Sequence, residues 1–266
     1  RFKREFITRR RSMKRISAIL LIWAFLLCMA APAATNEVTS VNIVGYTRLN
    51  LGPSNSLLLV GFNFEDVATA GPVMLKDLLG TNQLRQATLP TLADVVHYWD
   101  AEAVEYVTVY QKSDGNFYLT DDMTTVTNFP IETGDAFWLQ SPSGASDTNQ
   151  IVISGAVDCG ASSLRDIPTG LSQFTHPYAT PLDINSTNVD WIAEGATAGN
   201  LPTLADVIHI WDGTQYDTYF LKSDDKWYDS STFNLASNAI IGVGCGAWYE
   251  AKSLYTNEFV RPFSID

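Results

Sequence analysis

The 266-residue chain has few cysteines, few histidines and few basic residues. It contains three Cys, three His and 17 Lys or Arg, against 29 Asp or Glu. It has no Cys-x-x-Cys pair and no His-x-His or His-x-x-x-His spacing, so the usual zinc-ligand patterns are missing. A Gly-x-Ser-x-Gly elbow, a phosphate loop, a dinucleotide fingerprint and a zinc-protease helix are missing too. We therefore expect no catalytic residue, no metal site and no cofactor.

Long hydrophobic runs are also missing after the first 34 residues. Within them, Met13-Lys14-Arg15 is followed by the apolar stretch 16–29 and by the small residues Ala31-Pro32-Ala33-Ala34. This order is typical of a secretory signal peptide. Residues 1–12 resemble an upstream extension, with Met13 as the start. An uncleaved anchor is the alternative, since about nineteen apolar residues almost span a bilayer. The pattern predicts an exported protein in the periplasm, at the cell surface or outside the cell.

Basic residues are concentrated in this leader. Eight of the 17 Lys and Arg and one of the 29 Asp and Glu precede residue 35, which leaves nine basic and 28 acidic residues. The net charge after cleavage is about −19. Such a surface repels phosphate backbones and anionic lipids, so nucleic acids and membranes are not expected partners. The remaining partner classes are a surface polysaccharide or another envelope protein.

Two cysteines follow the leader, Cys159 and Cys245. In an oxidising compartment two exported cysteines suggest one disulfide. Such a bridge would close a loop of 87 residues. Two free, buried thiols are the alternative. Catalytic use is not expected, because the first repeat described below has Asp135 where the second has Cys245.

Twelve residues of the chain occur twice. Leu89–Asp100 reads LPTLADVVHYWD and Leu201–Asp212 reads LPTLADVIHIWD, so ten of the twelve positions are identical. The match continues at an offset of 110 as far as Gly134-Asp135-Ala136-Phe137-Trp138, which corresponds to Gly244-Cys245-Gly246-Ala247-Trp248. Repeats of this length are whole domains or half-domains.

Local patterns within the repeats favour strands. Residues 94–100 and 106–112 are rich in Val, Tyr, Thr and Trp, and turn residues separate them from each other and from 116–120. These three strands predict a meander. Further strands are expected at 41–51, 56–64, 136–140 and 150–157, a short helix at 73–79, and either type at 185–198. We predict an all-β protein of two tandem, homologous sandwich-like or barrel-like domains with very little helix. The expected organisation is a leader over 1–34, a first domain over 35–158 and a second over 159–266.

The repeated block places its side chains on two faces of a strand. Val95, His97 and Trp99 share one face, and Val96 and Tyr98 share the other. Both faces are largely apolar, which is typical of a central strand that is covered on both sides. Packing in the core of each domain would then explain why the block is nearly identical in the two copies.

The segments Val44-Gly45-Tyr46, Ala93-Asp94-Val95 with Trp99-Asp100, and Gly134–Trp138 carry a resemblance. Together they resemble uncharacterised exported bacterial proteins with the repeated pattern VGY…AD-x-V-x-x-WD…G-x-G/A-F-W. The segment His176-Pro177-Tyr178 with Asp183 and Trp191 is similar to the N-P-Y…D-W stretch of large secreted surface proteins, with His in place of Asn. These resemblances imply export and a β-module, and they bring no catalytic residue.

Candidate chemical groups have ordinary structural explanations. His97 and His209 lack a paired nucleophile, because Asp94 falls on the opposite strand face, so we expect packed, hydrogen-bonded histidines. The acidic turns at 113–115, 120–122 and 223–225 do not match a calcium loop, and turn chemistry explains them. Asp100 and Asp212 are expected to cap hairpins.

Aromatic residues are the most suggestive remaining class. Six aromatic residues of the first copy have aromatic twins in the second: Trp99, Tyr106, Tyr110, Phe117, Tyr118 and Trp138. They can form the two cores, which domains of about 110 residues need, or they can stack against sugar rings. We expect an exported, non-enzymatic protein with a structural, adhesion or assembly role. A carbohydrate-binding protein and an extracellular hydrolase are the alternatives.

Overall fold

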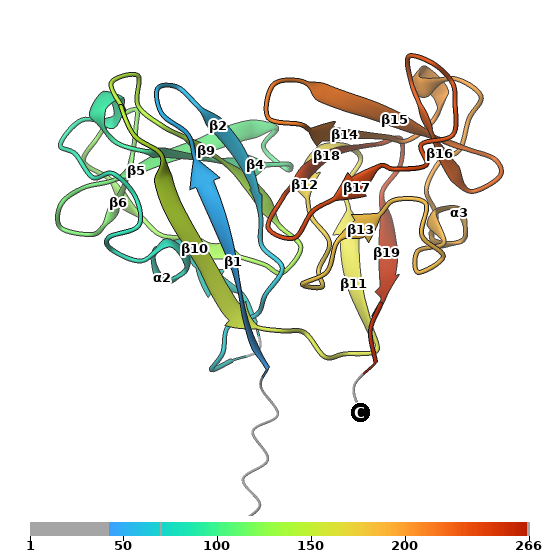
Figure 1. The fold of residues 1–266 in the computed structure, drawn as a ribbon, viewed down its shortest axis with the longest axis horizontal. Helices are drawn as coiled ribbons and strands as arrows, with labels where there is room; N and C mark the ends of the chain where they lie inside the picture. The colour runs from blue at the N-terminus through green and yellow to red at the C-terminus, as the bar shows by residue number, and fades with distance from the viewer. Residues whose placement is uncertain (1–42, 70, 265–266) are drawn as a thin grey trace, which may run out of the picture. The chain divides into compact units, whose positions relative to one another are not determined.

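The computed structural model describes residues 43–69 and 71–264. The expected leader, residues 1–34, lies outside the described residues. Both repeats belong to one compact unit, residues 42–266. The described chain consists mainly of antiparallel strands joined by turns, with very short helices (Figure 1). The expected all-β fold is confirmed.

The first repeat contains ten strands within the described chain. They are β1 (Val44–Leu51), β2 (Leu57–Gly61), β3 (Val73–Met74), β4 (Val95–Asp100), β5 (Glu105–Gln111), β6 (Phe117–Leu119), β7 (Val126–Thr127), β8 (Pro130–Ile131), β9 (Ala136–Gln140) and β10 (Asn149–Ala156). Helix α2 (Leu75–Leu79) and the 3₁₀ turn η1 (Pro90–Leu92) lie between β3 and β4.

The second repeat contains nine strands among the residues that the structure describes. They are β11 (Ser162–Ile167), β12 (Gly170–Phe174), β13 (Leu182–Asp183), β14 (Val207–Trp211), β15 (Tyr216–Lys222), β16 (Lys226–Asp229), β17 (Ile240–Ile241), β18 (Ala247–Ala251) and β19 (Tyr255–Val260). Helix α3 (Trp191–Glu194) and the 3₁₀ turn η2 (Pro202–Leu204) precede β14.

The large sheets of the two repeats share one strand order over five strands, and β7 extends only the sheet of the first repeat. The large sheet of the first repeat has the order β2-β9-β4-β5-β6-β7, and that of the second has the order β12-β18-β14-β15-β16. Each repeat adds a long two-stranded ribbon, β1-β10 or β11-β19, and a short pair, β3-β8 or β13-β17. Apart from β7, the sequence duplication is therefore a duplication of the arrangement of strands, including the expected three-stranded meanders β4-β5-β6 and β14-β15-β16.

Each repeat has its own hydrophobic core between its ribbon and its large sheet. In the first repeat, Leu49 and Ile151 of the ribbon share a buried cluster with Val96 and Leu139 of the sheet. A separate cluster in the second repeat includes Ile208 and Tyr249 of its sheet and Phe259 of its ribbon. Full burial of one such side chain stabilises a fold by about 1.5–3 kcal/mol.

The helical segments are shorter than expected. The segment 73–79 begins as strand β3 and becomes helical only at Leu75, and the ambiguous segment 185–198 contains only the four-residue helix α3. Asp190 begins α3, since its carboxylate accepts a hydrogen bond from the Ala193 backbone N–H at 3.1 Å. None of the helices in the described part of the chain has the length and hydropathy of a membrane-spanning helix.

Candidate functional site

Backbone hydrogen bonds join the two repeats at the edge strand β2. The Gly61 N–H donates to the Gly244 carbonyl at 2.9 Å, and the Gly246 N–H donates to the Leu59 carbonyl at 3.1 Å. A third bond runs from the Thr175 N–H to the Gly134 carbonyl at 2.8 Å. The edge strand of one sheet is thus covered by the other repeat. This junction is the place where side chains from both repeats meet.

Six aromatic side chains form a band across the junction, which we call the aromatic band: Trp99, Tyr106, Trp138, Trp211, Tyr216 and Trp248. Trp99 packs edge-to-face on Trp248 with ring centroids 5.4 Å apart, and Trp138 packs in the same way on Trp211 at 5.5 Å. Both contacts join one repeat to the other. The two contacts are equivalent, so the band has an approximate two-fold symmetry that relates one repeat to the other.

The tyrosines of the band follow the same symmetry. Tyr106 lies 5.0 Å from Trp99 and 6.3 Å from Trp248, while Tyr216 lies 5.0 Å from Trp211 and 6.4 Å from Trp138, all measured between ring centroids. Edge-to-face pairs of this kind contribute about 0.5–1.5 kcal/mol each beyond their burial. Together with the two tryptophan pairs, these contacts hold the rings in a fixed arrangement.

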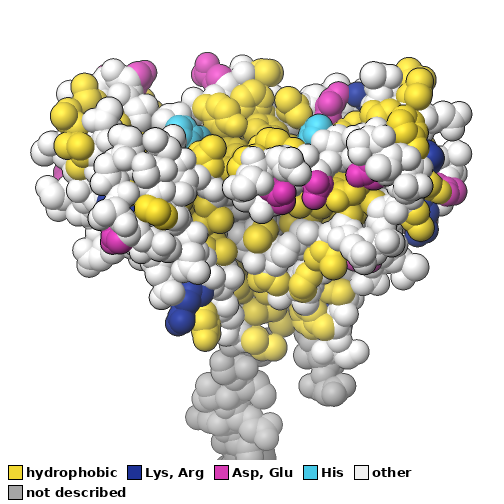
Figure 2. Space-filling model, turned by 45° about the horizontal axis from the view of Figure 1, so that its top comes forward, with side chains coloured by type: hydrophobic (Ala, Val, Ile, Leu, Met, Phe, Trp, Pro, Cys, Tyr) yellow, Lys and Arg dark blue, Asp and Glu magenta, His cyan; other side chains and the backbone are white. Residues whose placement is uncertain are grey.

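The band is buried in its middle and exposed at its tyrosines. Trp138 and Trp248 are buried and Trp99 and Trp211 are half-buried, but Tyr106 is 43% exposed and Tyr216 is 41% exposed. Figure 2 shows hydrophobic side chains gathered in the middle of the face that it turns forward, with histidine side chains on either side. The band thus combines a rigid base with accessible aromatic surface.

Hydrogen-bonding groups accompany these rings. The Trp99 indole N–H donates to the Leu171 carbonyl at 2.8 Å, and the Trp248 indole N–H donates to the Tyr216 hydroxyl at 3.1 Å. The Trp211 indole N–H is buried and has no partner within the described chain. Burial raises the pKa of Tyr106 to about 12. Its hydroxyl is therefore protonated at neutral pH and can both donate and accept a hydrogen bond.

The two strand histidines stand beside the band. The His97 ring nitrogens lie 3.2 Å from Thr108 Oγ1 and 3.0 Å from Gln140 Oε1, and His209 Nδ1 lies 3.0 Å from Thr218 Oγ1. Each ring also contacts its neighbouring tyrosine, at 6.0 and 6.1 Å between centroids. Burial lowers the pKa of both histidines. The expectation of packed, hydrogen-bonded strand histidines is confirmed.

No protein-family model, curated protein or solved structure matches this chain. The function proposed below therefore rests on the geometry of the junction.

The aromatic residues divide between core and band. Phe117 is buried in the first core and Tyr110 is fully buried, as expected for core residues. Trp99 and Trp138 instead belong to a separate cluster with Trp211 and Trp248, outside both cores. The two faces of the repeated strand are covered differently: Val96 belongs to the first core, whereas Trp99 packs on Trp248 of the other repeat. Packing in the core of each domain therefore explains only one of the two faces.

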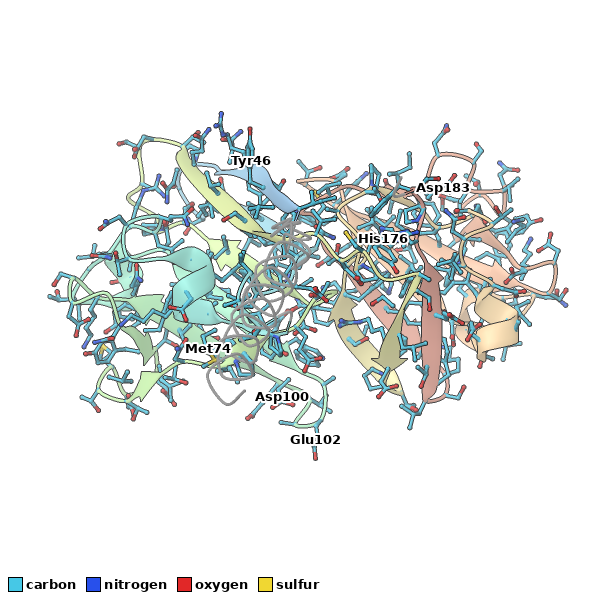
Figure 3. The ribbon with its side chains drawn as sticks, turned by 90° about the horizontal axis from the view of Figure 1, so that it is seen from below. Tyr46, Met74, Asp100, Glu102, His176 and Asp183 are labelled. Carbon is cyan, nitrogen blue, oxygen red and sulfur yellow. The ribbon has the colours of Figure 1, made fainter. Side chains whose placement is uncertain are left out.

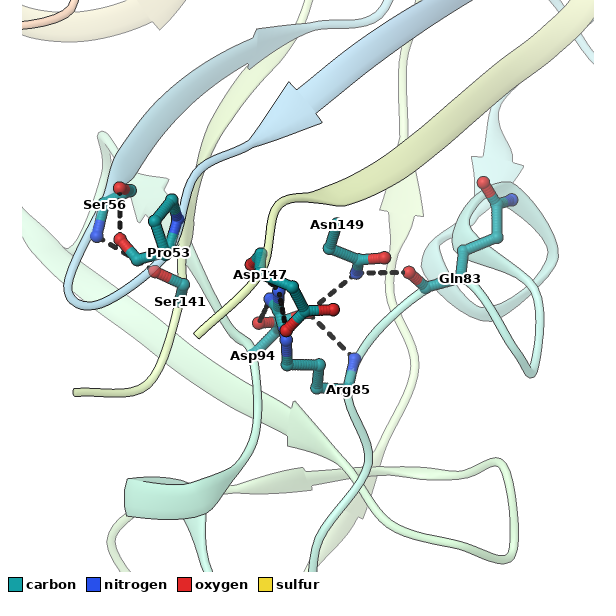
Figure 4. Close-up of polar contacts among 8 residues, drawn as sticks. All are labelled: Pro53, Ser56, Gln83, Arg85, Asp94, Ser141, Asp147 and Asn149. Carbon is teal, nitrogen blue, oxygen red and sulfur yellow. Dashed lines mark hydrogen bonds and ion pairs between the residues drawn. The ribbon is translucent and has the colours of Figure 1, made fainter. Parts of the chain in front are cut away.

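The Asp of the repeated block stabilises the preceding loop. Fully buried Asp94 accepts from the Arg85 backbone N–H at 2.8 Å, from its guanidinium at 2.9 Å and from Asn149 Nδ2 at 3.0 Å (Figure 4). Its twin Asp206 instead accepts from Thr197, Tyr249 and Lys252. Burial raises the pKa of Asp206. Asp94 thus joins the loop at Arg85 to β10, and Asp206 joins the loop at Thr197 to the end of β18, so both carboxylates have a structural role.

The acidic turns have the expected local role. Asp114 and Asp224 accept from the hydroxyls of Tyr118 and Tyr228, each at 2.7 Å. Asp100 caps the β4–β5 hairpin through the backbone N–H groups of Glu102 and Ala103, at a turn where Glu102 points outward (Figure 3). Asp212 does the same for Thr214 and Gln215. Within residues 43–69 and 71–264, no three His, Cys, Asp or Glu side chains gather as a metal site.

The expected disulfide is not formed in the structure, where both cysteines are free. Cys159 follows β10 and its thiol donates to the Val157 carbonyl at 3.3 Å. Cys245 lies in the turn that meets Val60 of the edge strand β2. The two residues therefore serve different segments: Cys159 lies between the repeats, and Cys245 belongs to the junction.

One junction residue is not brought out by the sequence patterns. Arg165 on β11 donates from its guanidinium Nη2 to Asp135 Oδ1 of the other repeat at 3.0 Å. In the sequence, this contact is indicated only by the difference between Asp135 and its twin Cys245, which gives the two repeats a different charge at this position. The arginine partner lies 30 residues away in a segment with no motif, so tertiary structure alone identifies it.

Proposed function

We propose that this chain is an exported, non-enzymatic binding protein with an adhesion or assembly role at the cell surface or outside the cell. The observation that carries the proposal is the aromatic band, which both repeats build and which leaves Tyr106 and Tyr216 exposed. Aromatic residues are enriched in binding surfaces because they bury a large area at a small cost in conformational entropy. The leader pattern, the acidic composition and the resemblance to exported repeat proteins support the location.

Export is tested by expressing the full chain in a Gram-negative host and fractionating the cells. We expect mature protein beginning near residue 35 outside the cytoplasm, identified by mass spectrometry of its N-terminus. A variant with Leu21 and Ile22 replaced by Arg breaks the apolar stretch 16–29 and serves as the control that should stay inside. Full-length wild-type protein found only in the cytoplasm contradicts the proposal.

A carbohydrate ligand is the second candidate, because the band is amphipathic. Its rings offer apolar surface, while the Tyr106 and Tyr216 hydroxyls and the flanking His97 and His209 offer polar groups. A sugar has the matching combination of an apolar ring face and hydroxyls. The acidic charge of the chain favours a neutral polysaccharide over an anionic one.

The double variant Tyr106→Ala/Tyr216→Ala tests this ligand class. We expect its retention on insoluble neutral polysaccharides to fall about tenfold or more, since each ring contact is worth about 0.5–1.5 kcal/mol and the two sites act together. The measurement is a pull-down isotherm on cellulose, chitin and mannan.

The matched control is Tyr118→Ala/Tyr228→Ala, a second pair of twin tyrosines, on the strands β6 and β16. Its retention should equal that of the wild type. Equal loss in both double variants, or no retention of the wild type on any of the three polymers, contradicts carbohydrate binding by the band.

A further inference from the structure

A pocket of about 270 Å³ opens beside the aromatic band, where the end of β4 meets the second repeat. Its walls come from both repeats and include Tyr98, Trp99, Asp100, Asp135, Arg165 and Ser172. Pockets for drug-sized ligands begin at about 300 Å³. The space here therefore suits a smaller ligand, about the size of one sugar ring.

An ion pair across the junction forms one wall of this pocket. Arg165 Nη2 donates to Asp135 Oδ1 at 3.0 Å and to the Gln173 carbonyl at 3.2 Å. The other oxygen, Asp135 Oδ2, accepts from the Glu132 N–H at 3.0 Å and lies 3.4 Å from the Tyr98 hydroxyl. Both charged groups are therefore held in place before any ligand arrives.

Two buried polar atoms of the pocket residues have no protein partner within the described chain. They are Ser172 Oγ and Arg165 Nε. Ser172 as a whole is only 5% exposed. A buried polar group without a partner destabilises a fold, so such groups are rare and need an explanation. A ligand hydroxyl in the pocket would supply the missing partner for each.

The pseudo-symmetric position in the other half of the junction lacks this chemistry. Gly134 faces Arg165 of the second repeat, but its twin Gly244 faces Thr47 and Leu49 of the first. The twin of Asp135 is Cys245. The repeats therefore pack together at that position without an ion pair, so packing alone does not require the Asp135–Arg165 pair.

We infer that this pocket binds one neutral sugar residue; the inference rests on the carbohydrate-binding candidate above. A hydroxyl is both donor and acceptor, so it can accept from Arg165 Nε and donate to Ser172 Oγ or the Asp135 carboxylate. The charges of Asp135 and Arg165 offset each other, which disfavours a charged ligand. Trp99, shared by the pocket and the aromatic band, supplies an apolar surface for the ring face.

The experiment is an NMR titration of the mature chain with glucose, galactose, mannose and N-acetylglucosamine in turn. We expect one of them to bind at millimolar concentration and to shift the amide signals of Ala101, Ser172 and Gln173. Ser172→Ala should weaken that binding about five- to tenfold, which corresponds to the loss of one hydrogen bond. Its Tm should not fall, because the hydroxyl has no partner within the described chain. Ser162→Ala, an exposed serine on β11, is the control that should bind as the wild type does.

Two further arms separate this inference from the function on which it rests. Oligosaccharides that carry the same residue at their non-reducing end should bind at least as tightly as the free sugar. If they bind more tightly and Tyr106→Ala/Tyr216→Ala abolishes that gain, the pocket and the band bind the same oligosaccharide molecule.

The inference is overturned if Ser172→Ala binds the sugar as tightly as the wild type, if acetate rather than a sugar shifts the pocket signals, or if none of the four sugars shifts them. Retention on polysaccharides in any of these cases leaves carbohydrate binding by the band intact. Loss of that retention as well removes both.

Discussion

At the scale of single residues, identical positions in the two repeats have different partners. Asp94 is paired with Arg85, while the twin Asp206 is satisfied by two backbone N–H groups and the Tyr249 hydroxyl. Both carboxylates perform the same task, which is to hold the loop before a central strand. The shared block therefore specifies the carboxylate, and each repeat supplies its own donors.

The two carboxylates around Arg85 provide a matched comparison. Asp94→Ala should lower the free energy of unfolding by about 3 kcal/mol, because it removes the buried acceptor of Arg85 Nη1 and of the Arg85 backbone N–H. Asp147→Ala should cost less than about 1 kcal/mol, because the Asp147 carboxylate is 78% exposed and lies 3.5 Å from the same guanidinium. Urea unfolding of the two variants measures the difference. Similar costs would contradict the assignment of Asp94 as the buried partner.

At the scale of elements, the repeated block contains two parts with different surroundings. Its strand part lies at the centre of each large sheet. Its LPTL part forms the turns η1 and η2, whose last leucines, Leu92 and Leu204, are 61% and 62% exposed. Core packing therefore explains only the strand part of the identity. The matching exposure of the leucines is a property of the turn.

The exposed leucines give a prediction about these turns. The double variant Leu92→Asn/Leu204→Asn should unfold within about 0.5 kcal/mol per site of the wild type, because surface substitutions rarely exceed that range. Differential scanning calorimetry provides the measurement. As a contrast, Val96→Ala on the neighbouring strand should cost about 1–3 kcal/mol, since Val96 is fully buried. A large loss in the leucine variant would show that η1 and η2 are buried in solution.

At the scale of the whole molecule, close backbone contact joins the two repeats. A Cβ atom on Gly61 would lie 2.5 Å from both the Cys245 carbonyl oxygen and Thr175 Oγ1. A Cβ atom on Gly246 would lie 2.5 Å from the Ala136 Cβ atom. The junction and its aromatic band therefore depend on small residues where the two sheets meet.

Gly61→Ala should accordingly push the repeats apart. Overpacking of this kind costs about 1–3 kcal/mol, and we expect Trp99 and Trp248 to become more accessible to iodide or acrylamide quenching. Gly144→Ala is the control, because a Cβ atom at Gly144 has no atom within 4 Å. Unchanged stability together with unchanged quenching in Gly61→Ala would contradict the close packing of the junction.

The sequence by itself determined the fold class, the duplication and the local turns. Alternating apolar residues give strands, and Asp100 and Asp212 bond to N–H groups two or three residues away, so short-range patterns contain these features. Because side chains alternate between the two faces of a strand, the sequence also predicts the face on which Trp99 lies.

Only the tertiary structure decided what that side faces. Trp99 meets Trp248, and Arg165 meets Asp135, across separations in sequence that no local pattern encodes. A half-buried aromatic face has the same composition whether it covers its own core or joins a second repeat. The aromatic band and the pocket therefore arise from how the two copies pack, because contacts between distant segments depend on the assembled shape of both sheets.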